Sequence, residues 1–222
     1  MIVMAFDLSS TCIGVVTARL NGTTVEKIMS CPIIPPSFDP VILGYKHSKK
    51  KLPTRSGELL NTYFKEGEVS ISKAEKQRRD DHVRAQKDIF VLSSIGKSLA
   101  NLMDNIKPDL ILVEKNAIFN GILTSILLAK VMGTLLGLAG RLGTPVKEYS
   151  VTKARSVFNV GREVVSFSKT QTEDELRKIP DITKRALGVL MNRKYGIVFK
   201  TDDESDACVL FNYWYEKEVL LK

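Results

Sequence analysis

The sequence predicts an α/β fold with five strands, and two observations support this prediction. Residues 1–31 contain three apolar runs in succession, and Asn21-Gly22, a strong hairpin signal, separates the second from the third. After residue 70, short apolar runs alternate with stretches of helical periodicity. We therefore expect three consecutive antiparallel strands, followed by strands that alternate with helices, in a single domain over residues 1–222.

The first apolar run, Ile2 to Phe6, ends in one carboxylate, Asp7. A buried, unpaired aspartate is costly, so we expect Asp7 to face a metal, a cation or an open cleft. The alternative is a carboxylate that caps the Ser-Ser turn after it. Gly14 then lets the second strand, Ile13 to Leu20, begin where a side chain would crowd the site. The third strand is expected over Thr23 to Cys31.

The charge and cysteine content limit the possible partners and compartments. The net charge of +8 and the pI near 9.3 favour a polyanionic partner, nucleic acid before an anionic membrane. The three cysteines form no C-x-x-C pair, which argues against a disulfide framework and a zinc site. We expect a cytoplasmic protein with no signal peptide, because Met1 leads straight into a strand-like run.

Residues 32–70 predict a basic insertion, either a long loop or a small excursion from the domain. The stretch contains several prolines and a basic segment from Lys46 to Lys51. Such a segment is either solvated surface or a DNA contact, and we expect Lys49, Lys50 and Lys51 to contact DNA. Ser72-Lys-Ala-Glu75 is a capping box that begins the next helix, whose basic early part includes the expected DNA contacts Arg78 and Arg79.

A second strand-end acid follows this helix. Asp109 to Glu114 predicts a short apolar strand that ends in Glu114, as the first strand ends in Asp7. The apolar helix after it, Phe119 to Leu142, is interrupted by Lys130, so we interpret it as buried and not as a membrane span. Its small residues permit a core position or a dimer contact.

The C-terminal third adds one more strand and the remaining acids. Pro145 to Tyr149 predicts the fifth strand, the polar residues 161–180 predict a mobile loop, and helices are expected after Ser150, over 181–192 and after Thr201. Four carboxylates lie in the first turns of the last helix, more than capping requires. Asp203 and Asp206 are three residues apart and therefore share one helix face.

The acids suggest a metal-dependent nuclease. Asp7, Glu114, Asp203 and Asp206 would repel one another without bound cations. Oxygen-only ligands suit magnesium or manganese, and two such ions about 4 Å apart can activate water and stabilise the leaving oxygen in phosphoryl transfer. On a basic protein, this chemistry points to nucleic-acid cleavage.

Four motifs in order resemble the RuvC-type Holliday junction resolvases of the RNase H-like superfamily. They are the opening strand with Asp7, Ser10 and Gly14; Val113-Glu114 before an apolar helix through Gly133; Glu148-Tyr149 before a basic helix and Gly161; and the closing Asp203-Glu-Ser-Asp206-Ala207. The resemblance covers about residues 1–31 and 90–216. It implies an RNase H-like fold, in which a five-stranded mixed sheet has helices on both faces.

The resemblance also implies a function and a set of site residues. It implies a homodimer through the 119–142 helix that makes paired symmetric nicks in four-way and other branched DNA. Magnesium, or manganese in its place, would bind as two ions per site to Asp7, Glu114, Asp203 and Asp206, which would be catalytic. It suggests further DNA contacts at Phe119, Lys153, Arg155 and Lys184.

Several departures and rival interpretations stay open. The insertion is larger than in the bacterial enzymes, Ala117 stands where an aromatic is expected, and Phe119 is either its replacement or core. These differences leave open a diverged, phage-type enzyme with broader specificity. The rivals are another RNase H-like nuclease that cuts RNA–DNA hybrids or acts in transposition, a non-catalytic nucleic-acid-binding module, and an actin-like ATPase.

Overall fold

The computed structural model describes residues 1–9, 11–51, 59–68, 70–115, 122–156 and 179–221. Two compact units make up the chain, one formed by Met1–Pro35 with Ile95–Lys222 and the other by Pro36–Ser94. The second unit contains most of the predicted insertion and the first part of helix α1 (Lys73–Ile106). That residues 1–222 form one domain with an insertion stays a prediction.

A five-stranded sheet forms the centre of the first unit and confirms the predicted strand count. Its order is β3-β2-β1-β6-β7. β1 (Ile2–Leu8), β2 (Ile13–Asn21) and β3 (Thr24–Ile33) are antiparallel, whereas β6 (Leu110–Glu114) and β7 (Val146–Tyr149) run parallel to β1. The sheet is therefore mixed, with a hairpin series on one side and helical crossovers on the other.

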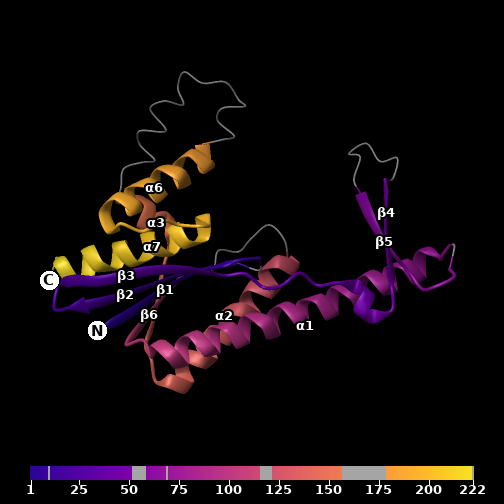
Figure 1. Cartoon of the computed structure of the whole chain (residues 1–222), viewed down its shortest axis with the longest axis horizontal. Helices are drawn as coiled ribbons and strands as arrows, with labels where there is room; N and C mark the ends of the chain where they lie inside the picture. Colours follow the sequence, from indigo (N-terminus) through magenta and orange to yellow (C-terminus); the bar gives the residue numbers. More distant parts are fainter. Residues whose placement is uncertain (10, 52–58, 69, 116–121, 157–178, 222) are drawn as a thin grey trace. The chain divides into compact units, whose positions relative to one another are not determined.

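Helices cover both faces of this sheet (Figure 1). On one face lie α3 (Val151–Ser156), α6 (Ile179–Tyr195) and α7 (Asp202–Trp214), which η2 (Tyr215–Leu220) continues as a π-helical turn. The other face carries α2 (Ile122–Leu142) and the C-terminal part of α1. The strands' buried side chains alternate between the two faces, as a half-turn per residue requires.

α7 is the most deeply buried helix among the described residues. From Glu204 to Asn212 every residue is buried, and Ala207 to Phe211 join the core formed with β1, β2 and β6. Burial of this kind stabilises a helix by about 25 cal/mol for each Å² of apolar surface removed from water. The start of α7 is thus held firmly against the sheet.

α2 differs from its prediction as a buried helix. One side is buried, through Val131, Leu135 and Ala139. The other side is exposed: Ile126 is 46% and Leu136 41% accessible. By length and composition alone α2 could cross a membrane, but a core helix of a soluble protein meets the same criteria. Only one side of α2 therefore packs into the core, and the apolar residues on its other side are exposed.

The second unit contains structure where a long loop was one of the two expectations. It includes the 3₁₀ helix η1 (Pro40–Leu43) and a separate two-stranded sheet of β4 (Lys46–Lys51) and β5 (Leu59–Phe64). The excursion predicted as the alternative is therefore present. The loop predicted over residues 161–180 lies almost wholly outside the described residues.

Candidate functional site

Two of the four predicted acids end neighbouring strands on one face of the sheet. β1 and β6 pair in parallel with Phe6 opposite Val113, so Asp7 and Glu114 occupy equivalent positions one residue further along. Each acid continues the alternation of residues that join the α7 core, namely Val3 and Ala5 in β1 and Leu110 and Leu112 in β6. Both acids therefore lie at the carboxyl ends of their strands, on the face that α7 covers.

The other two acids lie at the start of α7, where a capping box orders the backbone. The Thr201 hydroxyl accepts a hydrogen bond from the Glu204 amide at 3.3 Å, and the Glu204 carboxylate accepts one from the Thr201 amide at 2.9 Å. This reciprocal pair satisfies two amides that would otherwise lack partners. Glu204 is thus a structural acid, and its T-x-x-E pattern was visible in the sequence.

Gly14 allows the start of α7 to reach Asp7. Gly14 is the partner of Asp7 in the β1–β2 ladder. An added Cβ on Gly14 would lie 2.0 Å from the Asp203 carbonyl oxygen and 2.5 Å from the Glu204 amide nitrogen. Only a residue without a side chain permits so close an approach. This contact brings the Asp203 backbone directly over the strand pair that carries Asp7.

The other three predicted acids all affect the electrostatics of Asp7. Asp7 is only 7% exposed. Its burial, a hydrogen bond with the Glu114 carboxyl group, and the charges of Asp206, Glu114 and Asp203 together raise the pKa of Asp7 from 3.8 to about 9. At neutral pH without cations, Asp7 therefore keeps its proton.

Arg155 neutralises a second acid of the cluster. Its Nη2 lies 2.6 Å from Oδ2 of Asp206, which is 2% exposed. The arginine comes from α3 and is predicted as a DNA contact, whereas its partner is predicted as a metal ligand. The sequence did not indicate this pairing, because 51 residues separate the two.

The four acids suit hard divalent cations, although the described side chains are not arranged for coordination. Among these residues, no three His, Cys, Asp or Glu side chains are spaced to hold a metal ion. A proton on Asp7 and the guanidinium of Arg155 instead offset the charge. All four side chains offer only oxygen ligands, which magnesium and manganese prefer. Cations of this type could replace both the proton and the arginine.

Removing Arg155 is expected to increase the effect of magnesium on stability. Arg155→Gln leaves Asp206 buried without this counter-ion. Because the Arg155 side chain is 31% exposed, the metal-free protein should lose less than a fully buried pair would cost, roughly 1–3 kcal/mol. Magnesium should then raise the melting temperature by more than it does in the wild type, because no arginine competes for the carboxylate. Melting curves with EDTA and with magnesium test this. Lys153→Gln, exposed on the same helix, is the control; equal magnesium shifts in both variants would contradict the competition.

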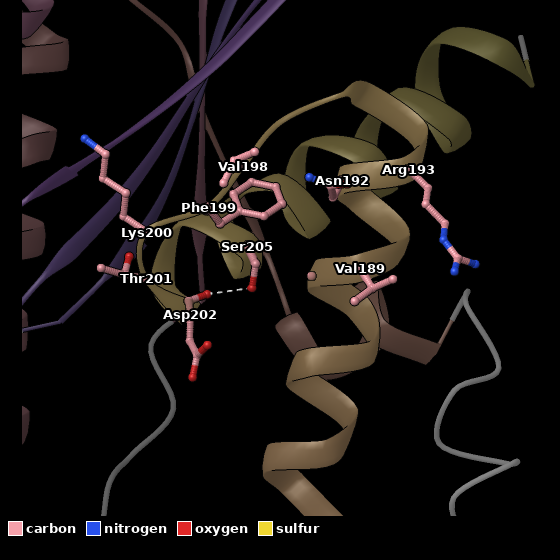
Figure 2. Close-up of a pocket in the computed structure, with 10 residues that line it drawn as sticks. Val189, Asn192, Arg193, Val198, Phe199, Lys200, Thr201, Asp202 and Ser205 are labelled. Atoms are coloured by element: carbon pink, nitrogen blue, oxygen red, sulfur yellow. Dashed lines mark hydrogen bonds between the residues drawn. The ribbon is translucent and has the colours of Figure 1, made fainter.

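A hollow of about 780 Å³ lies between α6 and the segment that leads into α7 (Figure 2). Val189 and Phe199 contribute apolar surface, while Lys200 and Arg193 extend to opposite sides. Asp202, which precedes Asp203, also lines it. Apolar groups flanked by cations suit a nucleotide, whose base has apolar faces and whose phosphate is anionic.

The predicted DNA contacts differ in their surroundings. Arg78 and Lys153 are exposed, as a contact residue requires. Arg79 is 5% exposed and paired with Glu68 and Glu75, so we assign it a structural role and not the predicted DNA contact. Phe119 and the side chains of four predicted contacts lie outside the described part of the chain: Lys49, Lys50, Lys51 and Lys184.

Comparison with known proteins identifies the fold. No family model and no curated protein matches the sequence. Among solved structures, RuvC from T. thermophilus in complex with a Holliday junction substrate has a TM-score of 0.51 at 10% identity, over 99% of this chain and 98% of that one. Thermus thermophilus RuvC alone gives 0.49 at 10% identity, with the same coverage. The yeast mitochondrial Holliday junction resolvase Ydc2 gives 0.39 at 12% identity, over 96% and 78%.

The first of these similarities carries the structural conclusion. The chain has the α/β, RNase H-like fold of RuvC, with a five-stranded mixed sheet between helices. The resemblance in the sequence motifs is thus confirmed at the level of the fold. Activity, metal and assembly are inferences from the residues of this chain.

Proposed function

We propose that this protein is a RuvC-type, metal-dependent endonuclease that resolves four-way DNA junctions, and other branched DNA, by paired symmetric nicking. The observation that carries the proposal is geometric: Asp7 and Glu114 end adjacent parallel strands, and the backbone of Asp203 at the start of α7 lies against Gly14, the strand partner of Asp7. The basic charge of the chain supports a polyanionic substrate. Because the chain shares its fold with a junction resolvase, junction cleavage is favoured over the other functions that an acidic cluster can have.

The four acids have distinct structural supports in this mechanism. Asp7 and Glu114 are fixed by the pairing of β1 with β6, while Asp203 and Asp206 move only with α7. We propose that they hold two magnesium ions, for which manganese can substitute. Such ions, when bound, activate a water and stabilise the leaving oxygen of the phosphodiester.

Arg155 has a second role in this proposal. A guanidinium binds phosphate oxygens as well as carboxylates, through the same planar set of donors. Once a cation neutralises Asp206, Arg155 can transfer to the DNA backbone without leaving a buried charge behind. The predicted DNA contact and the observed ion pair are then two states of one side chain.

A panel of substrates tests the function. In magnesium, we expect symmetric nicks in opposite strands of a four-way junction and little cutting of linear duplex. Calcium should bind but support little cutting, because its looser coordination holds the attacking water less strictly. Preferential cutting of an RNA–DNA hybrid would indicate another RNase H-like nuclease. ATP hydrolysis without nuclease activity would favour the actin-like rival.

We also propose a homodimer through α2, as paired nicking requires two sites. The exposed side of α2 combines Ile126 and Leu136 with small residues, Gly133, Gly137 and Gly140. A Cβ added at any of these glycines would meet nothing within 4 Å, so the close approach that they allow is not used by the described residues of the chain itself. A second copy of α2 is the expected occupant.

Gly137→Glu is expected to dissociate this dimer and leave the subunit folded. The new side chain enters open space in one subunit but meets its own charge across the dimer axis. Light scattering should change from twice the 24.8 kDa chain mass to the chain mass. Asn101→Glu, which adds the same charge to an exposed site on α1, should stay dimeric. A monomeric wild type bound to a junction would remove the basis for paired nicking.

We propose a cytoplasmic location without membrane attachment. The three cysteines are free, and two of them, Cys12 and Cys208, are buried. This is typical of proteins kept in a reducing compartment.

A further inference from the structure

One wall of the hollow between α6 and α7 is fixed by hydrogen bonds of the chain itself. Gly196 ends α6 in a left-handed conformation, with φ of 69°, and its amide donates to the Asn192 carbonyl oxygen at 2.7 Å. The Asn192 side chain donates to the carbonyl oxygen of Ile197 at 2.6 Å, and Ile197 is buried in the core. At the other end of this wall, the Lys200 amide donates to the Glu204 carboxylate at 2.8 Å. The wall is thus held at both ends, and ligand sites in proteins are usually preformed in this way.

The wall and the helix opposite it expose apolar side chains to the hollow. Val198 is 80% and Val189 50% exposed. Phe199 packs partly against the core, and its side chain is also part of the lining (Figure 2). A single exposed apolar residue is common on a protein surface, but three that line one hollow form a surface that an apolar group can cover. The volume of about 780 Å³ is in the range of small-ligand sites, roughly 300–1,000 Å³.

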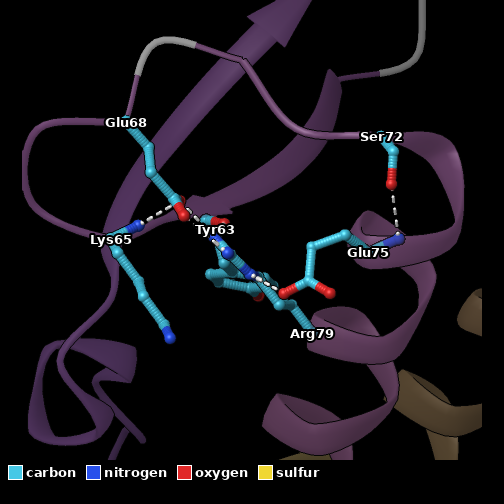
Figure 3. A network of polar contacts seen from close by, with 6 residues as sticks. All are labelled: Tyr63, Lys65, Glu68, Ser72, Glu75 and Arg79. Carbon is cyan, nitrogen blue, oxygen red and sulfur yellow. Dashed lines mark hydrogen bonds and ion pairs between the residues drawn. The ribbon is translucent and has the colours of Figure 1, made fainter.

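Two cations flank this apolar surface and are not bound to carboxylates. Arg193 and Lys200 extend to opposite sides, and neither forms an ion pair with another described residue. Arg79 in the second unit is different, because its guanidinium donates to Glu68 and to Glu75, each at 2.8 Å (Figure 3). Arg193 and Lys200 are therefore available to bind phosphate.

The acid in the lining, Asp202, does not oppose a phosphate there. Its carbonyl oxygen accepts a hydrogen bond from the Ser205 hydroxyl at 2.8 Å. Its carboxylate points away from Phe199 and Val198 (Figure 2). The hollow therefore offers a ligand apolar surface, with positive charge at its margins.

An unpaired nucleotide has the chemistry that this arrangement requires. Its base has two apolar faces, and within a strand it is flanked by phosphates. In a paired duplex, neighbouring bases cover these faces, so an intact duplex cannot fill an apolar hollow. A base that has left the stack can enter such a site, and it leaves most easily where it is unpaired.

We propose that this hollow binds one unpaired nucleotide of the DNA substrate. The base would lie against Val189, Val198 and Phe199, and the flanking phosphates would bind Arg193 and Lys200. The proposal rests on the proposed function, because it takes DNA as the substrate, and it deepens that function by explaining a preference for branched DNA. A branch point can supply an unstacked nucleotide, whereas a linear duplex must first be opened at a cost in free energy.

Filling the hollow without changing its charge tests the site. Gly188 lines it from α6, and an added Cβ would meet only Ser205, at 3.7 Å or more, which is ordinary contact. Gly188→Ala therefore leaves most of the space open, whereas Gly188→Leu fills it, and both residues favour a helix over glycine. Anisotropy of labelled oligodeoxythymidine is measured in EDTA. Gly188→Leu should weaken binding roughly 5- to 30-fold, the effect of losing one stacked base, and Gly188→Ala should change it little.

A strand without bases tests whether the base itself is bound. An abasic strand of the same length keeps the phosphates and lacks every base. The wild type should bind oligodeoxythymidine at least about 5-fold more tightly than the abasic strand. Gly188→Leu should bind the two strands alike. Circular dichroism checks that the variant is folded, and the comparison of the two strands on the wild type decides the question if it is not.

A double substitution tests the cations. Arg193→Gln with Lys200→Gln should lower the log–log salt slope of single-strand binding by roughly 0.7 for each phosphate that is no longer neutralised, up to about 1.4. The control, Lys97→Gln with Lys217→Gln, removes two exposed charges elsewhere in the same unit and should change the slope little.

Three results would each overturn the proposal: equal binding by Gly188→Leu and Gly188→Ala, equal affinity of the wild type for the two strands, or equal salt slopes in the two double variants. Displacement of the strand by free thymidine monophosphate at the concentration at which unlabelled strand displaces it would assign the hollow to a free nucleotide instead. None of these measurements depends on cleavage. Failure of junction cutting alone would therefore contradict only the nuclease function.

Discussion

Replacing Gly14 with alanine is expected to abolish cleavage and to destabilise the protein by roughly 3 kcal/mol or more. Overpacked side chains alone typically cost about 1–3 kcal/mol, and here the new Cβ would lie 2.0 Å from a backbone oxygen, that of Asp203. Backbone cannot rotate away as a side chain can. The start of α7 would therefore move outward and take Asp203 and Asp206 away from Asp7.

Urea denaturation and magnesium-induced thermal shifts measure the two effects of this variant. The urea concentration at the midpoint of unfolding should fall. The increase in melting temperature that magnesium causes should shrink, because the acids no longer converge. Gly96→Ala in α1 is the matched control, since its Cβ would meet only the Thr134 methyl carbon, at 3.4 Å, and alanine favours a helix. It should be neutral or slightly stabilising. A Gly14→Ala protein with normal stability and nicking would disprove the role of this contact.

Asp7→Asn is expected to abolish nicking while junction binding persists. The amide keeps the shape of the side chain but supplies one oxygen and no charge for a cation. Loss of a residue that only supports a metal ligand typically lowers metal affinity or activity about 10- to 100-fold. Loss of a central ligand should therefore lower the cleavage rate roughly 1,000-fold or more. Single-turnover cleavage and anisotropy on the same junction separate the two properties. Asp202→Asn, at an exposed acid of the same region, should cut normally; near wild-type cutting by Asp7→Asn would refute the metal site.

The raised pKa of Asp7 adds a pH dependence to this variant. The folded-state pKa is about 9 and the ordinary value is 3.8, so the protein binds a proton on folding between these limits. The stability contribution of this proton is fully present below pH 4 and is lost as pH rises toward 9, by up to about 1.4 kcal/mol per pH unit. In EDTA, the stability of Asp7→Asn relative to that of the wild type should therefore increase as the pH rises from 5 to 8. A constant difference in melting temperature would show that Asp7 is ionised in the folded protein.

The sequence alone was enough to predict the five strands of the central sheet and the acids that end two of them. Asp7 and Glu114 each close an apolar run, and this local pattern persists whatever the rest of the chain does. The excess of carboxylates before an apolar helix likewise marked Asp203 and Asp206 as more than caps. Local propensity and periodicity decide such features, because they depend on neighbours within a few residues.

Only the tertiary structure decided how these residues are used. It paired Arg155 with Asp206, buried Arg79 among acids of the second unit, and left one side of α2 exposed. It also placed the backbone of Asp203 against Gly14, although almost the whole chain separates them. Partners this distant are selected by strand register and helix packing, which no short window of sequence contains.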